Sequence, residues 1–323
     1  MTFSLPLSLG SMCTGYGGLD LAVAEVLDVA PVWVADPAPG AAAVLAHRFP
    51  GVPNLGDLTA VDFGRVPPVD VLCAGFPCQD LSYAGRGAGI REGTRSGLWH
   101  VIADAVGVLR PRYLVLKNVS AIVARRPGLD VVLADLAALG FTAEWTCLRA
   151  SDIGAPHARN RWFLAAEDPH RATGGQRRQP APRQAQSWRA RPDTGRRGGA
   201  PAPDARCQGR QGAGGAQERH PATAQRRPGG IGWGAYRPAI DRWEHLTGRT
   251  APHPTEPTGR NGAHRLSPLF VEWLMGLPNG WVTDVPALSR NQQLTLLGNG
   301  VLPRQGAAAL AGLFARLSAD RTP

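Results

Sequence analysis

Lysine is almost absent from this sequence of 323 residues. Lysine and arginine together number 35, and Lys117 is the single lysine among them. The scarcity excludes lysine as the source of the positive charge, which arginine side chains carry almost alone. Because the sequence otherwise avoids this residue type, position 117 is a candidate for a functional substitution.

Cysteine is also scarce, and the five cysteines show neither a paired spacing nor a metal-ligand pattern. The sequence therefore predicts no disulfide framework and no metal site, and we expect reduced thiols in a cytoplasmic protein. Long apolar runs are absent as well, which excludes a membrane-spanning helix. The first residues lack the pattern of a signal peptide.

The remaining composition supports a folded core. Hydrophobic residues make up 43% of the chain, and its length suits one large domain with a smaller one. The formal net charge is +10. Residues 168–230 hold nearly all of this excess positive charge, because they contain thirteen arginines and only four acidic residues.

Residues 168–230 are rich in Gly, Pro, Gln and Ala and have almost no large apolar residue beyond Trp188. Such a segment buries too little surface to fold alone, so we expect it to be disordered. Two interpretations stay open. The segment is a flexible polycation that binds DNA phosphate, or a linker whose arginines reflect a biased genome composition.

A short motif follows the apolar run Val69–Ala74, which is typical of a buried parallel strand. It reads Gly75-Phe76-Pro77-Cys78-Gln79. A cysteine held by a preceding proline at the C-terminal end of such a strand lies where open α/β sheets bind ligands. Cys78 is therefore a candidate nucleophile, whereas we expect Cys73 to be a buried structural cysteine.

Other motifs follow one another in a recognisable order. They are Ser11–Ala22 with its glycine turn, Asp36, Gly56–Thr59, the Pro-Cys-Gln segment, Lys117–Val119, Gly154–Arg161, Arg265–Pro268 and the stretch from Gln293 to Val301. Through this series the chain resembles the DNA (cytosine-5)-methyltransferases over nearly its whole length outside residues 168–230. Where that family has Glu-Asn-Val, this sequence has Lys117-Asn118-Val119.

The resemblance implies an α/β fold. It consists of a Rossmann-like S-adenosylmethionine-dependent methyltransferase domain with a mostly parallel sheet, and a smaller, irregular target-recognition domain. Alternation of apolar strands with helical patterns over residues 1–165 favours the same sheet. The expected strands are Leu5–Leu9, Val32–Val34, Val69–Ala74, Tyr113–Leu116 and Trp162–Ala165. The expected helices are Gly18–Leu27, Gly40–Arg48, Leu98–Leu109, Leu129–Leu139 and Arg304–Leu317.

We expect the catalytic domain at residues 1–167 and 290–323, and the target-recognition domain at residues 231–289. Within it, Trp233, Tyr236, Arg237, Arg249, Arg260 and Asn261 are candidates to touch DNA, and we expect Trp243 in a small core.

The donor, S-adenosylmethionine, is implied to bind at the glycine turn, where the backbone passes close to its methionine part because glycine has no Cβ. Asp36 is placed to accept hydrogen bonds from ribose hydroxyls. Cys13 replaces an aromatic residue common in the family, which predicts weaker stacking on the adenine or another stacking side chain. By resemblance, Asp57 contacts the adenine amino group and Asn299 the methionine end. The expected donor contacts are Thr14, Gly15, Tyr16, Gly17, Gly18, Asp36, Asp57, Leu58, Pro77, Asn299 and Val301.

The chemistry implied by the resemblance needs a nucleophile from the protein to activate the base, because carbon 5 of cytosine is itself a poor nucleophile. The thiolate of Cys78 adds at carbon 6 of a base flipped out of the helix, and carbon 5 then attacks the methyl sulfonium. Arg159 and Arg161 are expected to bind the flipped base and its phosphates, with salt bridges at the sheet edge as the alternative. Expected DNA contacts are Gln79, Ser82, Arg86, Arg95, Asn118, Arg237, Arg260 and Arg265.

Lys117 occupies the place of the family's catalytic glutamate, which both donates a proton and accepts a hydrogen bond. An ammonium group has three donors and no acceptor. We therefore expect slow or absent methylation. The alternatives are a silent DNA-binding relative, and a transferase redirected to a base with a carbonyl at position 4 or to a donor with a carboxylated methyl group.

The partners expected are double-stranded DNA and, genetically rather than physically, a restriction endonuclease. RNA stays open as a substrate, and we expect a monomer without membrane contact.

Overall fold

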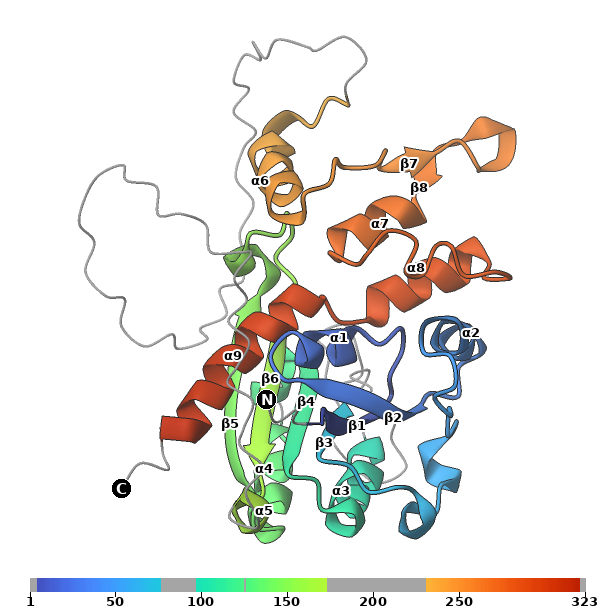
Figure 1. The fold of residues 1–323 in the computed structure, drawn as a ribbon. Coiled ribbons are helices and arrows are strands. Elements are labelled where there is room, and N and C mark those ends of the chain that lie inside the picture. Colours follow the sequence, from blue (N-terminus) through green and yellow to red (C-terminus); the bar gives the residue numbers. More distant parts are fainter. Residues whose placement is uncertain (1–4, 77–96, 125, 173–230, 320–323) are drawn as a thin grey trace, which may run out of the picture.

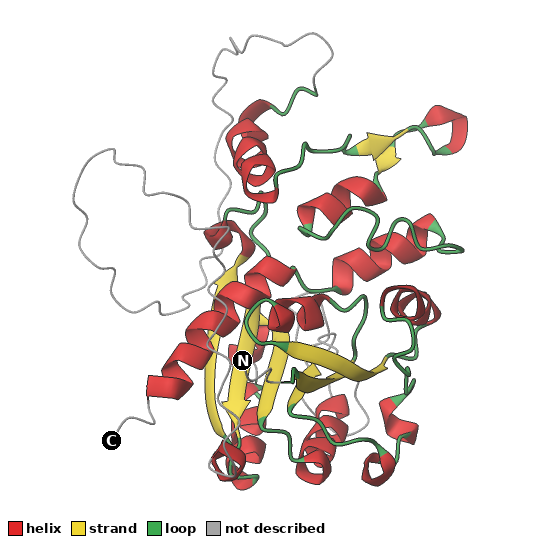
Figure 2. Cartoon of the chain, in the orientation of Figure 1, coloured by secondary structure: helices red, strands yellow, loops and turns green. Residues whose placement is uncertain are grey.

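A six-stranded sheet forms the centre of the computed structural model, which describes residues 5–76, 97–124, 126–172 and 231–319 (Figures 1 and 2). The strand order is β2-β1-β3-β4-β6-β5. Neighbours among β1 to β4 are parallel, whereas β6 pairs antiparallel with both β4 and β5. The strands are β1 Leu7–Met12, β2 Val29–Ala35, β3 Val71–Ala74, β4 Tyr113–Val119, β5 Thr142–Arg149 and β6 Asn160–Glu167. The predicted α/β class with a mostly parallel sheet is confirmed.

The predicted strands overlap observed ones with somewhat different bounds, and two strands differ more. The first strand runs from Leu7 to Met12 rather than over Leu5–Leu9, because Gly10, Ser11 and Met12 continue the parallel ladder with β2. The edge strand β5 was not predicted. Its side chains are only partly buried or exposed, so its sequence lacks the apolar run that marked the other strands.

Helices cover both faces of the sheet. On one face, α3 (Leu98–Leu109) and α4 (Leu129–Ala138) pack their apolar side chains into the first core cluster. On the other face, α1 (Gly18–Ala24) and α9 (Pro303–Ala319) build the second cluster. The prediction for α3 coincides with the observed helix, and the predicted Arg304–Leu317 lies inside α9.

A further group of helices and strands lies together on one side of the sheet domain (Figure 1). They are α6 Arg237–Thr247, β7 Thr255–Glu256, β8 Arg265–Leu266, α7 Pro268–Leu274 and α8 Arg290–Asn299, with α2 (Pro39–Arg48) at the β2 edge. A third core cluster joins them to the sheet domain, since Tyr16 and Ala155 share it with Trp243, Trp273 and Leu297. The division of the chain at residue 231 therefore stays a prediction.

Ordered structure extends past residue 167. Asp168 is 1% exposed in its side chain and accepts a 2.6 Å ion-pair contact from Arg110, and α5 spans Pro169–Ala172. The rest of the segment predicted to be disordered, residues 173–230, lies outside the described residues. Across the described ranges, no helix is long and apolar enough to cross a membrane.

Candidate active site

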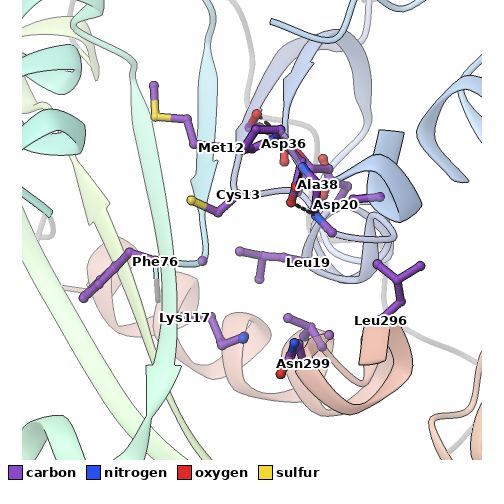
Figure 3. Close-up of a pocket in the computed structure, with 18 of the residues that line it drawn as sticks. Met12, Cys13, Leu19, Asp20, Asp36, Ala38, Phe76, Lys117, Leu296 and Asn299 are labelled. Atoms are coloured by element: carbon purple, nitrogen blue, oxygen red, sulfur yellow. Dashed lines mark hydrogen bonds between the residues drawn. The ribbon is translucent and has the colours of Figure 1, made fainter. Parts of the chain in front are cut away.

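A cavity of about 730 Å³ lies beside the C-terminal ends of β1, β3 and β4 (Figure 3). Ligands of open α/β sheets bind outside the carboxyl ends of the parallel strands, so the position fits a substrate or cofactor site. The wall from the N-terminal part of the chain includes Met12, Cys13 and Asp36. The opposite wall comes from Leu296 to Val301, so two distant parts of the chain enclose the cavity.

Lys117 lines this cavity from β4. Its neighbour two residues earlier, Val115, belongs to the core beneath α1 and α9, and alternate residues of a strand share a face. Lys117 therefore projects toward the side of the sheet that α9 covers. Figure 3 shows its ammonium group directed toward Asn299 across the cavity.

The glycine turn is tied to the end of β2. The Thr14 hydroxyl donates to the main-chain oxygen of Ser11 (3.1 Å) and accepts from the main-chain NH of Ala35 (3.2 Å). Gly15 has a φ of 60°, and its NH donates to Asp36 Oδ2 at 2.9 Å. Thr14, Gly15 and Asp36 all line the cavity, as the sequence predicted for donor contacts. Their role toward a donor stays a prediction.

Asp36 is held in place from two sides. Its Oδ1 accepts a 3.0 Å hydrogen bond from the NH of Ala38, and Asn54 bonds both its main-chain NH and its carbonyl at 3.0 Å. The carboxylate is thus fixed on the cavity wall with acceptor capacity left over.

Asp57 and Leu58 are not part of the cavity lining, although Asp57 is near enough to help raise the pKa of the Cys13 thiol, and their role toward a donor stays a prediction. Asp57 is exposed and caps a short 3-10 helix, accepting hydrogen bonds from the NH and hydroxyl of Thr59 (3.0 and 2.9 Å). These bonds lower the pKa of Asp57 below its usual range. Leu58 is buried in the first core cluster.

Tyr16 lies behind the cavity wall rather than on it. Its side chain is fully buried, and its hydroxyl donates to the main-chain oxygen of Val301 at 2.6 Å. Burial raises the pKa of Tyr16 well above its usual value, so the hydroxyl stays protonated as a donor. A Cβ at Gly18 or Gly300 would lie 2.6 or 1.9 Å from the Tyr16 ring. These two glycines therefore make room for the tyrosine, whereas Gly17 adopts a φ of 80°.

The opposite wall is formed where α8 ends. Asn299, Gly300 and Val301 line the cavity. The Arg159 guanidinium donates through Nη2 to the carbonyl oxygens of Gly298 (3.0 Å) and Gly300 (2.6 Å). Arg161 instead donates to the main-chain oxygen of its neighbour Asn160 at 2.8 Å.

Asn118 connects β4 to the residue before the Pro-Cys-Gln segment. It is buried, its Nδ2 donates to the main-chain oxygen of Phe76 at 3.3 Å, and its Oδ1 accepts from the NH of Val119 at 2.8 Å. Phe76 itself lines the cavity. The predicted residues Pro77, Cys78, Gln79, Ser82, Arg86 and Arg95 lie outside the described residues.

Two residues of the cavity have perturbed acidity. Burial, together with the nearby Asp36, raises the pKa of the Cys13 thiol to about 12, while Lys117 acts in the opposite direction. The Cys13 side chain is thus a neutral, small group on the wall. Burial also raises the pKa of Asp20 to about 6, against a smaller lowering by the Ser11 hydroxyl.

Sequence reasoning did not single out many residues of the wall, among them Asp20, Thr295 and Leu296. Asp20 stood inside the glycine-turn motif, and the other two followed Leu294 in the last motif, so the motifs contained them without distinguishing them. Asp20 is 3% exposed, and within the described part of the chain its carboxylate oxygens have no hydrogen-bond partner of good geometry, although the Ser11 hydroxyl is near enough to lower its pKa.

The predicted DNA-contacting residues after residue 230 are mostly on the surface. Arg260 and Arg265 are exposed, and Arg237 pairs with Asp241 at 2.7 Å. Trp243 is fully buried, as expected for a core residue. Within the described ranges, no group of three or more His, Cys, Asp or Glu side chains is placed to hold a metal ion.

Comparison with known proteins defines the class. Residues 7–192 match the C-5 cytosine-specific DNA methylase family, and because this is more than half of the chain, the protein belongs to that family. Type II methyltransferase M.NlaIV of Neisseria lactamica is 35% identical over 142 residues, which cover 41% of this chain and 33% of the relative. Type II methyltransferase M2.BsuMI of Bacillus subtilis is 33% identical over 168 residues, covering 49% and 42%. The chain thus spans about a third of the length of M.NlaIV.

Proposed function

We propose that this protein transfers a methyl group from S-adenosylmethionine to carbon 5 of cytosine in double-stranded DNA, at a rate that Lys117 lowers. The observation that carries the proposal is that the glycine turn, Asp36, Asn299, Phe76 and Lys117 line one and the same cavity, in a chain of this family.

The residues of the cavity fit a donor of net positive charge. S-adenosylmethionine carries a sulfonium and an ammonium group against one carboxylate, and Asp20 and Asp36 place two carboxyl groups on the N-terminal wall. Asp36 would hold the ribose hydroxyls, and Asn299 would contact the methionine part from the opposite wall. When bound, the donor supplies an electrophilic methyl group.

Cys78 provides the nucleophile. Its thiolate adds to carbon 6 of the flipped cytosine, and the electron pair of the ring's double bond becomes available at carbon 5 for attack on the methyl group. Loss of the carbon 5 proton then expels the thiolate and restores the aromatic ring. Asn118 supports this step by holding the main chain at Phe76, two residues before Cys78.

Lys117 activates the cytosine ring less well for thiolate addition than a glutamate would. It offers a donor to ring nitrogen 3 but no acceptor for the exocyclic amino group of cytosine. Loss of a positioned acid typically lowers a rate by on the order of 10²–10⁴. We infer that the protein binds donor and DNA but methylates slowly.

The test is transfer of labelled methyl from S-adenosylmethionine to duplex DNA. The natural chain is compared with Lys117→Glu, Lys117→Gln and Lys117→Glu combined with Cys78→Ala. We expect a gain of at least about 100-fold for Lys117→Glu, a smaller gain for Lys117→Gln, and none in the double variant. Equal rates for the natural chain and Lys117→Glu would show that the lysine is a working replacement.

A second candidate is a change of specificity, which the position of Lys117 on the cavity wall favours. An ammonium group suits a base with a carbonyl at position 4, or a donor with a carboxylated methyl group. Uracil-containing duplexes and the carboxylated donor, offered to the natural chain, test both forms. Modification of either by the natural chain but not by Lys117→Glu would support it over impairment.

The Type II relatives support a role as the modification half of a restriction–modification system. We place the catalytic domain at residues 1–167 and 290–323 and target recognition at residues 231–289. We further propose that the protein acts as a cytoplasmic monomer.

A further inference from the structure

The Arg159 side chain binds the C-terminal end of helix α8. Its guanidinium bonds the carbonyls of Gly298 and Gly300, the residues on either side of Asn299. The last carbonyls of an α-helix have no partner within it, and the helix dipole places negative charge there. A guanidinium is therefore well matched to the C-terminus of α8.

The main chain at Arg159 is in turn bound by α9, the helix that follows the segment to which Arg159 donates. The Gln305 side chain in α9 donates to the main-chain oxygens of Arg159 (2.8 Å) and Leu148 (2.7 Å). Gln305 is fully buried, so these bonds are shielded from water. The start of β6 and the segment 298–305 thus form one reciprocally bonded unit.

The same segment forms one wall of the donor cavity through Asn299, Gly300 and Val301. We infer that Arg159 is a positioning residue for the methyl donor, because its two bonds set where Asn299 stands on that wall. The inference rests on the proposed function. It differs from the expectation that Arg159 serves the flipped base and its phosphates.

Arg161 is the matched control. It carries the same charge two residues later, and its side chain donates to the main-chain oxygen of Asn160 in its own strand. If both arginines serve DNA, their variants should behave alike. If Arg159 positions the donor site, the Arg159 variant alone should lose affinity for S-adenosylhomocysteine.

The experiment measures two dissociation constants for the full chain: S-adenosylhomocysteine by calorimetry, and a fluorescent DNA duplex by anisotropy. We expect Arg159→Ala to weaken S-adenosylhomocysteine binding by roughly tenfold, because two charge-assisted bonds are lost, and to change duplex binding by less than about threefold. Arg159→Lys should recover part of the affinity. Arg161→Ala should leave the S-adenosylhomocysteine constant unchanged. Weakened duplex binding with unchanged S-adenosylhomocysteine binding in Arg159→Ala would overturn the inference.

Tyr16→Phe gives a second route if the Arg159 variants do not fold. It keeps the ring between Gly18 and Gly300 and removes only the bond to Val301 on the same wall segment. We expect a several-fold loss of S-adenosylhomocysteine affinity without loss of duplex binding, and no loss would count against the inference.

In the Lys117→Glu background, Arg159→Lys should raise the KM for S-adenosylmethionine and leave kcat nearly unchanged. A fall in kcat at constant KM would contradict a positioning role. If neither the natural chain nor Lys117→Glu binds S-adenosylhomocysteine, the proposed function fails. If the natural chain binds it and Arg159→Ala binds it equally well, only the present inference fails.

Discussion

The Tyr16 hydroxyl donates a 2.6 Å hydrogen bond to the main-chain oxygen of Val301, 285 residues further along the chain. In turn, the indole NH of Trp281 donates to the main-chain oxygen of Tyr16 at 2.8 Å. Tyr16 therefore joins the glycine turn, the residues that lead into α9 and the segment that carries Trp281. The hydrogen bonds connect both walls of the cavity through a residue that does not line it.

Replacement of Gly300 by alanine should disturb this connection. The added Cβ would lie 1.9 Å from the Tyr16 ring, so backbone or ring must move. We expect a loss of about 1–3 kcal/mol in the free energy of unfolding, measured by urea denaturation. Gly298→Ala is the control, because nothing lies within 4 Å of its Cβ and alanine favours the helix. Equal destabilisation by both changes would contradict the packing argument.

Glu272 should be intolerant of neutralisation. It is 2% exposed, and its carboxylate accepts from the NH groups of Gly280, Val282 and Thr283 and from the Thr283 hydroxyl, at 2.6–3.0 Å. The Glu272→Gln amide turns an NH₂ group toward donors. We expect a loss of about 2–4 kcal/mol, followed by tryptophan fluorescence during denaturation. Glu25→Gln, at an exposed position, should change stability little, and an equal effect of both would refute the argument.

Asp20 should make stability depend on pH. Burial raises the pKa of Asp20 from 3.8 to about 6, so the folded state binds this proton more tightly than the unfolded chain does. The unfolding free energy of the natural chain therefore falls, for this group, as pH rises from about 4 to 6, and the cost is complete above pH 6.

Asp20→Asn removes that titration. The stability of the variant relative to the natural chain should rise by roughly 3 kcal/mol between pH 4 and pH 7.5. Urea denaturation of both proteins across this range measures the difference. A difference that stays constant with pH would show that the carboxyl group is not perturbed in this way.

Asn118 and Asn54 should affect different steps of the reaction. In the Lys117→Glu background, Asn118→Ala frees the main chain at Phe76 and should lower methyl transfer at least about tenfold with S-adenosylhomocysteine affinity unchanged. Asn54→Ala loosens Asp36 and should weaken that affinity instead. Rapid-quench kinetics and calorimetry separate the two, and identical effects would contradict the assignment.

The sequence predicted the parts of the site that depend on local patterns. Asp36 and Lys117 follow or end apolar strands, and the carboxyl ends of parallel strands meet at one edge of a sheet, so their shared cavity was foreseeable. Asn299 was placed by the order of motifs alone. These predictions needed no knowledge of how distant segments pack.

Contacts between distant segments could not be predicted in this way. The fully buried Tyr16 and the bonds of Arg159 to α8 depend on where residues 298–301 fold back, which no local spacing encodes. Asp57 is exposed and accepts hydrogen bonds from Thr59, and its expected contact with the adenine amino group stays a prediction. The sequence did not predict the partly exposed strand β5, because this strand has no apolar run.

The position of α9 has a consequence for synthesis of the protein. This helix covers the face of the sheet that carries Leu9, Val71 and Val115, yet the ribosome makes it after everything else that the structure describes. Until then the part of this apolar face that α9 covers is exposed, although α1 packs beside it, and one wall of the cavity is missing. The chain should therefore need protection from aggregation while it is being translated, and it should gain affinity for its donor only after α9 has docked.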